Sequence, residues 1–433
     1  MAHEPAAMEV PVRRLEEAPD RARLLASTLV GIGVVALVAA FLTSPTRAWR
    51  AYLFNWLYWT SLAQGAVMVA AVASITRGLW SRPVRRIALS FVAFLPISYL
   101  ALLPLLLFGG EHVFPWIEAP VAGKEAWLNL PFLVARNLVA LGFMYFLSLR
   151  FAYWALRPDL GLTRDQAPPQ LRGLYQRFTA NWRGQDAEEA RSFRKLARLA
   201  PAMALVYAAS FSLLAWDLVM SLEPHWWSTL IGPYFFMAAF LGGLAALAVA
   251  TILYRRPLGL DGIVQPSTFH DVGKLTFGFC AFWAYLLWSQ YLVIWYGLLP
   301  HEQEFVIHRL ELPFAPVAVA VFLCMFVIPF FGLLGVQPKK RPALLGTFAS
   351  VVLVGLWLER YVLVYPSYTF SRNEGLPFGL PEVGMALLFG GLFIFALLFF
   401  AVRFPMIQLW QPPSELELLA GAAEPPGEVV TAE

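Results

Sequence analysis

The chain has little charge, cysteine or histidine. Only 14% of its 433 residues are Asp, Glu, Lys or Arg, against about 25% in an average soluble domain. Its two cysteines, Cys280 and Cys324, lie in apolar runs outside any CxxC or CxxCH motif. This pattern excludes a disulfide framework, covalent haem and cysteine-ligated iron-sulfur clusters. The six histidines fall in the tail, in loops or at the ends of apolar runs. The chain therefore lacks axial ligands for a haem b between helices, and it also lacks a Walker A loop and an HExxH motif.

Long apolar runs dominate what remains. Hydrophobic residues make up 59% of the chain, and the mean hydropathy is +0.63. A helix needs about 20 apolar residues to cross a bilayer. Because the runs are continuous rather than alternating, the sequence predicts an all-α polytopic membrane protein and not a barrel. The ten predicted spans are 24–43, 52–76, 87–108, 128–151, 197–221, 229–254, 272–297, 313–335, 342–365 and 382–403.

Two pairs of motifs indicate an internal duplication. The segments 128–132 and 310–314 read Leu-Asn-Leu-Pro-Phe and Leu-Glu-Leu-Pro-Phe, and each opens an apolar run. Asp217 and Glu359 each lie seven residues before a proline, inside an otherwise apolar span. Spans two to five then correspond to spans six to nine, with the two acids at matching places. The predicted organisation is a tail (1–23), a peripheral helix (24–43), a four-helix bundle (52–221, with a loop at 152–196), a second four-helix bundle (229–365), a peripheral helix (382–403) and a partly disordered tail (404–433).

The distribution of Lys and Arg predicts the orientation. With the N-terminus inside, 24 of the 32 basic residues fall on the inner side and five on the outer side. Cytoplasmic loops carry such an excess, so both termini are predicted to be cytoplasmic. The same excess explains the pI near 9.0 without a nucleic-acid partner. In the inner loop 152–196, Pro168-Pro169 and the charged stretch 183–198 predict a short amphipathic helix on the membrane surface.

Charged side chains inside spans are the leading functional candidates. They are Asp217, Glu359, Arg136 and Arg360, and Arg136 is a candidate partner of Asp217. Proton handling or polar-ligand binding is one interpretation of these residues. The other is a structural ion pair that fixes the packing of the helices.

Further candidates lie at the outer side and along span seven. Glu223 and His225 follow Asp217 in a tight outer turn, and they form either a proton relay or a solvated turn. In span seven, polar side chains share a predicted face that could bind a quinone or order a water chain, or could simply join helices by hydrogen bonds. The candidates for this second role are Tyr285, Ser289 and Gln290, together with Lys274 at the start of the span and His301 and Glu302 in the loop that follows. No catalytic or metal-binding residue is predicted.

Several of these motifs resemble a known family. They are the run 217–229, the run 274–296 with Phe-Trp-Ala-Tyr and Trp-Ser-Gln-Tyr, the segment 128–132 with Arg136, and Glu-Arg-Tyr at 359–361 with Pro-Ser at 366–367. Together they resemble the F subunit of bacterial alternative complex III, within the polysulfide-reductase membrane-subunit (NrfD-like) family, and the resemblance extends over all ten spans. One departure is Pro300-His301-Glu302, where that family has Pro-Glu-Glu. The resemblance therefore assigns no acidic role to position 301.

The resemblance implies a subunit of a quinol:electron-acceptor oxidoreductase in the bacterial cytoplasmic (inner) membrane. The implied partners are a paralogous integral membrane subunit, an iron-sulfur subunit and multihaem cytochrome c subunits, which carry the haems and clusters. The chain itself would contribute proton conduction or binding of a quinone such as menaquinone, without a complete catalytic site of its own. Two alternatives remain open. One is an NrfD-like anchor that exchanges electrons with quinone for an iron-sulfur/molybdoenzyme complex, and the other is a purely structural paralogue.

Overall fold

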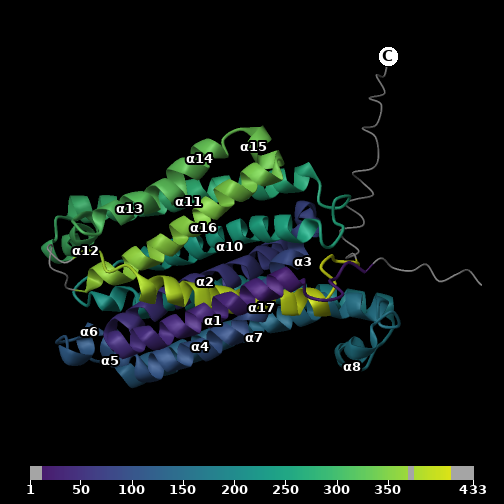
Figure 1. The fold of residues 1–433 in the computed structure, drawn as a ribbon, viewed down its shortest axis with the longest axis horizontal. Helices are drawn as coiled ribbons and strands as arrows, with labels where there is room; N and C mark the ends of the chain where they lie inside the picture. The colour runs from purple at the N-terminus through teal and green to yellow at the C-terminus, as the bar shows by residue number, and fades with distance from the viewer. Residues whose placement is uncertain (1–11, 369–374, 411–433) are drawn as a thin grey trace, which may run out of the picture.

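The computed structural model describes residues 12–368 and 375–410 (Figure 1). Within these residues the secondary structure is helical, without strands. Ten helical segments are long and apolar enough to cross a membrane. Each coincides with a predicted span, so the all-α class and the ten predicted spans are confirmed for the described part of the chain.

Six of these spans are single helices, and most of them begin next to a proline, whose fixed φ suits the first turn. In α7, Asn129 also caps the helix by accepting a hydrogen bond from the Phe132 amide at 3.2 Å. The six are α1 (Asp20–Thr43), α2 (Pro45–Ile75), α7 (Leu130–Leu162), α10 (Ile231–Arg255), α11 (Pro266–Gly297) and α17 (Leu380–Arg403).

The other four spans contain a tighter or wider turn. Span three comprises η1 (Leu79–Ser81), α3 (Arg82–Ser90), η2 (Phe91–Phe94) and α4 (Leu95–Phe108). Span five is α9 (Gln185–Leu218) with the 3₁₀ turn η3 (Met220–Leu222), and span nine is α16 (Pro342–Val364) with η5 (Tyr365–Ser367). Span eight is α13 (Ala315–Phe322), a π-helical turn η4 (Leu323–Val327) and α14 (Ile328–Gly332). Short helices connect the spans: α5 (Gly110–Val113), α6 (Pro115–Glu118), α8 (Pro169–Phe178), α12 (Pro300–Leu310) and α15 (Val336–Lys340).

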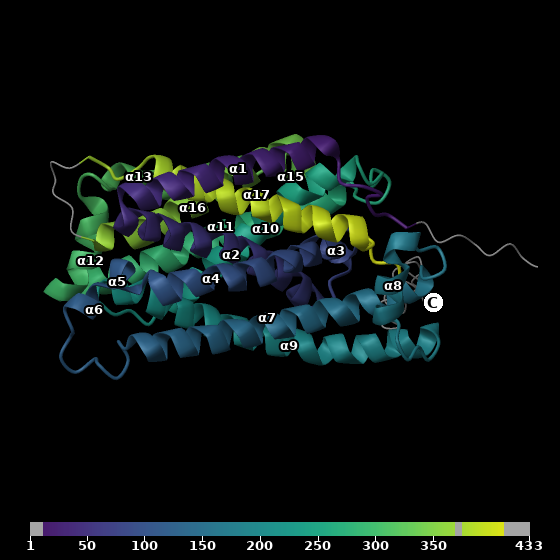
Figure 2. The same cartoon turned by 60° about the horizontal axis from the view of Figure 1, so that its bottom comes forward.

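The spans run side by side and give the molecule two ends (Figures 1 and 2). Helices α5, α6 and α12 lie at one end, and α8 and α15 lie at the other. We call these the α12 end and the α8 end.

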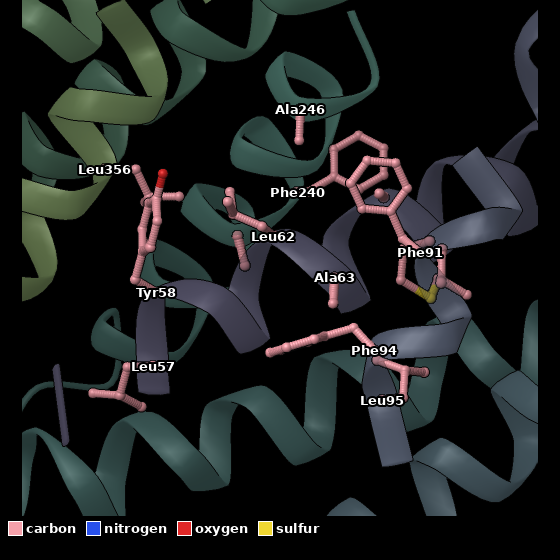
Figure 3. Close-up of a cluster of buried hydrophobic side chains, with 14 of the residues drawn as sticks. Leu57, Tyr58, Leu62, Ala63, Phe91, Phe94, Leu95, Phe240, Ala246 and Leu356 are labelled. Atoms are coloured by element: carbon pink, nitrogen blue, oxygen red, sulfur yellow. The ribbon is translucent and has the colours of Figure 1, made fainter. Parts of the chain in front are cut away.

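Helices α2 and α10 pack against each other at the centre. Helix α2 also contacts α4, α9, α16 and α17, and α10 contacts α9, α11 and α16. Helix α1 packs chiefly on α17. The buried side chains between these helices form one apolar core, part of which is drawn in Figure 3: Leu62 and Ala63 of α2, Phe91, Phe94 and Leu95 of span three, Phe240 and Ala246 of α10, and Leu356 of α16.

The backbones of α2 and α10 are in direct contact. A Cβ atom added at Gly65 would lie 2.0 Å from the Ala239 carbonyl oxygen, and one added at Gly243 would lie 2.2 Å from the Gly65 carbonyl carbon. Small residues allow helices in membranes to approach in this way. Any side chain at either position would force the two central helices apart.

The predicted organisation of the inner loop needs one correction. The surface helix is α8, which begins at Pro169, but the charged stretch 183–198 does not form a separate helix. It belongs almost entirely to α9, which runs without interruption from Gln185 to Leu218. Gly184, with φ of 100°, ends the preceding turn, and the charges continue the helix beyond the apolar span. The prediction of a partly disordered tail falls mainly on residues outside the described part.

Candidate functional site

The acid in span five forms a closed ion pair with span four. Asp217 is fully buried, and its two carboxylate oxygens accept hydrogen bonds from Arg136 Nη2 and Nε at 2.6 and 2.7 Å. Asn137 Nδ2 donates a third bond at 2.6 Å. The Arg136 guanidinium lies 4.0 Å from the ring centroid of Trp127 and donates to that residue's carbonyl oxygen. The predicted partnership of Arg136 with Asp217 is confirmed, and both oxygens of the acid are already engaged.

The acid in span nine is held by its own neighbour. Glu359 Oε2 accepts a hydrogen bond from Arg360 Nη1 at 2.6 Å, and its Oε1 lies 3.5 Å from Trp283 Nε1 of α11. Arg360 reaches across to α2 and α10, where it donates to Ser61 Oγ and the Phe235 carbonyl oxygen, both at 3.3 Å. Glu359 thus faces α11, whereas Asp217 faces α7. The prediction of matching places fails at the level of contacts, because the two acids have partners on helices that the repeat does not equate.

Glu359 lies on the wall of a largely apolar cavity of about 410 Å³ between α11, α12, α13 and α16. The other side chains of its lining with polar atoms are Tyr234, Trp283, Trp288, Gln290, Tyr291 and Arg309. The Gln290 Oε1 atom is buried without a hydrogen-bond partner among the described residues. The surface-exposed side chains Trp288, Val319 and Phe322 also line the cavity, so it reaches the apolar outer face of α11 and α13. Its volume falls within the usual range of about 300 to 1,000 Å³ for ligand sites.

The structure separates the candidates predicted on span seven. Gln290 lines the cavity, on the same stripe of α11 as Trp283, Leu287 and Ile294. Tyr285 and Ser289 do not line it, because successive residues of a helix are rotated by about 100° and these two fall on the side of α11 that faces away from the cavity. Tyr285 is 62% exposed and packs against Phe282. The prediction that these three residues share one polar face is therefore wrong.

Lys274 is also distant from this cavity. It lies 16 residues before Gln290 on α11, which corresponds to about 24 Å along the helix. Its side chain is exposed and forms an ion pair with Asp271 at 2.7 Å. The structure does not bring it together with the other candidates.

A second, more polar cleft of about 510 Å³ opens at the α12 end. Glu223, His225 and His301 line it together, as do His112 and His308. The rings of His225 and His301 lie 6.0 Å apart, and both residues are exposed. Glu302 lines neither this cleft nor the apolar cavity. Tyr368 also lines the cleft, and burial raises the pKa of its phenol, so the hydroxyl stays protonated and donates to the Val113 carbonyl oxygen.

Arg309 joins the apolar cavity to the polar cleft. It lines the cavity, and its Nη1 donates to Glu223 Oε1 of the cleft at 2.7 Å. Ser367 links the same two residues through hydrogen bonds of 2.8 Å, and His308 Nδ1 lies 3.9 Å from Glu223 Oε2. Burial lowers the pKa of Arg309 while Glu223 opposes that shift, and an arginine keeps its charge at neutral pH. Nothing in the sequence pointed to Arg309, which lies in α12 between spans seven and eight.

Several further buried ion pairs were not predicted, and two of them join segments remote in sequence. Near the α12 end, Glu382 is fully buried, binds Arg47 through two hydrogen bonds of 2.8 and 2.9 Å, and accepts a bond from Tyr365. At the α8 end, Asp159 pairs with Arg86. The acids stand at the edges of apolar runs, where charges are ordinary, and their partners are remote in sequence. Only the pairing itself reveals them.

Comparison with protein-family models and with curated proteins finds no match to this chain.

Proposed function

We propose that this chain is an integral membrane subunit of a quinol:electron-acceptor oxidoreductase of the alternative complex III type, in which it binds a quinone and conducts protons. The observation that carries this proposal is the apolar cavity that extends from the outer face of α11 and α13 to the buried carboxylate of Glu359. A quinone has the matching chemistry, with a hydrocarbon tail for the lipid-facing mouth and a polar head for the inner wall.

The polar groups of the cavity suit a quinone head group. The Gln290 amide and the Trp283 indole nitrogen can donate hydrogen bonds to its oxygens, and Glu359 can accept a proton from a quinol. Arg309, Glu223 and the histidines of the cleft then continue the polar groups toward the α12 end. We assign proton handling to Glu359, Glu223 and His225. Asp217 and Arg136 fit a structural role better, because both carboxylate oxygens of Asp217 already accept hydrogen bonds from Arg136 or Asn137.

The packing of the spans supports the two-bundle organisation. Under the repeat, α2, α4, α7 and α9 correspond to α10, α11, span eight and α16. In the first set α2 contacts α4, α4 contacts α7, α7 contacts α9, and α9 contacts α2. The corresponding pairs of the second set also contact each other. Helices α1 and α17 lie beside the first set. This organisation agrees with two four-helix bundles and two peripheral helices.

The partners and the location follow from the resemblance. We propose a bacterial cytoplasmic (inner) membrane with the arginine-rich α8 end in the cytoplasm. The partners would be a paralogous integral membrane subunit, an iron-sulfur subunit and multihaem cytochromes c, which hold the redox groups. Copurification of a molybdoenzyme subunit in their place would favour the NrfD-like anchor.

Photolabelling of the purified complex with an azidoquinone tests the quinone site. We expect the label on α11 and α13, within 284–294 and 318–322, and we expect excess quinone to suppress it. Val319→Trp should block the mouth and abolish labelling. Val354→Trp is the matched control, because Val354 is exposed to a similar extent (53% against 55%) but does not line the cavity. Labelling that is unaffected by Val319→Trp, or confined to other helices, would overturn the assignment.

A further inference from the structure

A third cavity, of about 200 Å³, lies at the α8 end, far from the proposed quinone site. The end of α2, helices α3, α7 and α9, and the segment after α17 enclose it. Three arginines line it, Arg77, Arg85 and Arg86, whereas no carboxylate of the described residues belongs to its lining. A site with this charge selects anions.

Arg86 presents unused donors in this cavity. It is 2% exposed, and its Nη2 donates to Asp159 and to the Ala155 carbonyl oxygen. Its Nε and Nη1 atoms are buried without an acceptor among the described residues. Buried donors without a partner are costly. The Nε and Nη1 hydrogens point to different sides of the guanidinium, so an oxygen-rich anion in the cavity would satisfy one of these two atoms through a charge-assisted hydrogen bond.

Arg77 keeps a positive charge at the cavity. Asp159 offsets only Arg86, and its Oδ1 is already taken by the backbone amides of Leu409 and Trp410 at 2.9 and 3.1 Å. Arg77 is exposed at the mouth and forms no ion pair with another described residue. The charge of Arg77 is thus available to a ligand.

Most of the other wall residues are apolar. Phe151, Phe193, Leu196 and Ala200 line the cavity, and the exposed Ala197 and Pro201 carry the lining onto the outer surface of α9. A ligand held here would place its charge among the arginines and a hydrocarbon part along α9. Basic pockets between membrane helices on the cytoplasmic side bind lipid phosphates in this way.

We propose that this cavity binds a phosphate group, and that an anionic phospholipid supplies it. This inference does not depend on the proposed quinone chemistry, because the cavity lies at the opposite end of the spans.

Native mass spectrometry of the complex, purified in nanodiscs of phosphatidylcholine with a small fraction of phosphatidylglycerol, tests the proposal. Wild-type protein should retain phosphatidylglycerol preferentially. Arg77→Gln should weaken retention about fivefold, the effect of one basic residue near a membrane surface. Ala197→Trp, which keeps every charge but fills the cavity, should abolish it. Arg256→Gln is the matched control, an exposed arginine at the same end that does not line the cavity.

The outcomes are distinct. Equal losses for Arg77→Gln and Arg256→Gln would mean general attraction of anionic lipid and would overturn the site. Full retention by Ala197→Trp, with an unchanged melting temperature, would also overturn it. Titration of sodium phosphate into pure phosphatidylcholine nanodiscs separates the sources. Binding of phosphate that Arg77→Gln weakens, without preference for phosphatidylglycerol, would uphold the phosphate site and overturn the lipid as its source.

Discussion

The first half of the chain buries a carboxylate whose hydrogen bonds are complete, whereas the second half buries one beside an open cavity. Asp217 receives three hydrogen bonds from Arg136 and Asn137. Glu359 is bonded by Arg360 at 2.6 Å and also has Trp283 and Tyr234 as hydrogen-bond partners, but it lies on the wall of a cavity of about 410 Å³. A buried acid can thus serve helix packing in one half and chemistry in the other. The groups around the carboxylate decide between these roles, whereas its position inside an apolar run of the sequence does not.

The largest expected effect is on stability in the first half. Asp217→Asn removes the charge that compensates the buried guanidinium of Arg136, and breaking such a pair costs about 3 to 5 kcal/mol. We expect a lower free energy of unfolding and less assembled complex. Adding Arg136→Gln should restore part of the loss, because no charge is then stranded, and a double-mutant cycle measures the coupling. Wild-type stability with reduced proton release in Asp217→Asn would give this acid the role assigned to Glu359.

The next effect is on activity in the second half. Glu359→Gln keeps the shape of the side chain but cannot exchange a proton near neutral pH. Because it also removes the charge that compensates the buried Arg360, some loss of stability is expected as well, and activity is compared only for complex that assembles. Quinol-driven turnover of the assembled complex should fall by about 100-fold or more, in the range of a lost general acid or base. Turnover and proton release are measured on equal amounts of complex. Unchanged values for both would remove Glu359 from the mechanism.

A smaller effect is expected where the cavity meets the outer cleft. Glu223→Gln weakens the contact of Arg309 with the cleft, and Glu223 itself does not line the apolar cavity proposed to bind quinone. We expect proton release to slow on the order of tenfold, with the apparent affinity for quinol unchanged. Stopped-flow pH measurements separate the two quantities. A parallel change in affinity would indicate a disturbed cavity and no relay.

The smallest expected effect distinguishes two neighbouring residues of α11. Gln290→Ala removes a cavity-lining amide, and quinone binding should weaken about fivefold, as expected for about 1 kcal/mol of one hydrogen bond. Ser289→Ala is the control, since Ser289 does not line the cavity. Competition for the azidoquinone label reports both affinities. Equal effects of the two substitutions would place the quinone elsewhere.

The ten spans could be predicted from the sequence because each is a long apolar run, which can be recognised without knowing how the helices pack. It also predicted the pairing of Asp217 with Arg136, since charges inside apolar runs need partners. It failed for Tyr285 and Ser289, because the side of α11 that faces the cavity depends on how this helix is rotated in the packed molecule. Glu382 with Arg47, 335 residues apart, could not be found either. Such pairs follow from the order of helices in space, which hydropathy does not encode.

The backbone contact between Gly65 and Gly243 limits the motions available to the protein. With a carbonyl group and small residues in direct contact between α2 and α10, neither half can slide or turn against the other without breaking this backbone contact at the centre. Transport by rocking of two halves, as in many secondary carriers, requires such movement. A rigid scaffold of this kind is suited to the proposed passage of protons between fixed groups, for which only side chains and bound molecules need to move.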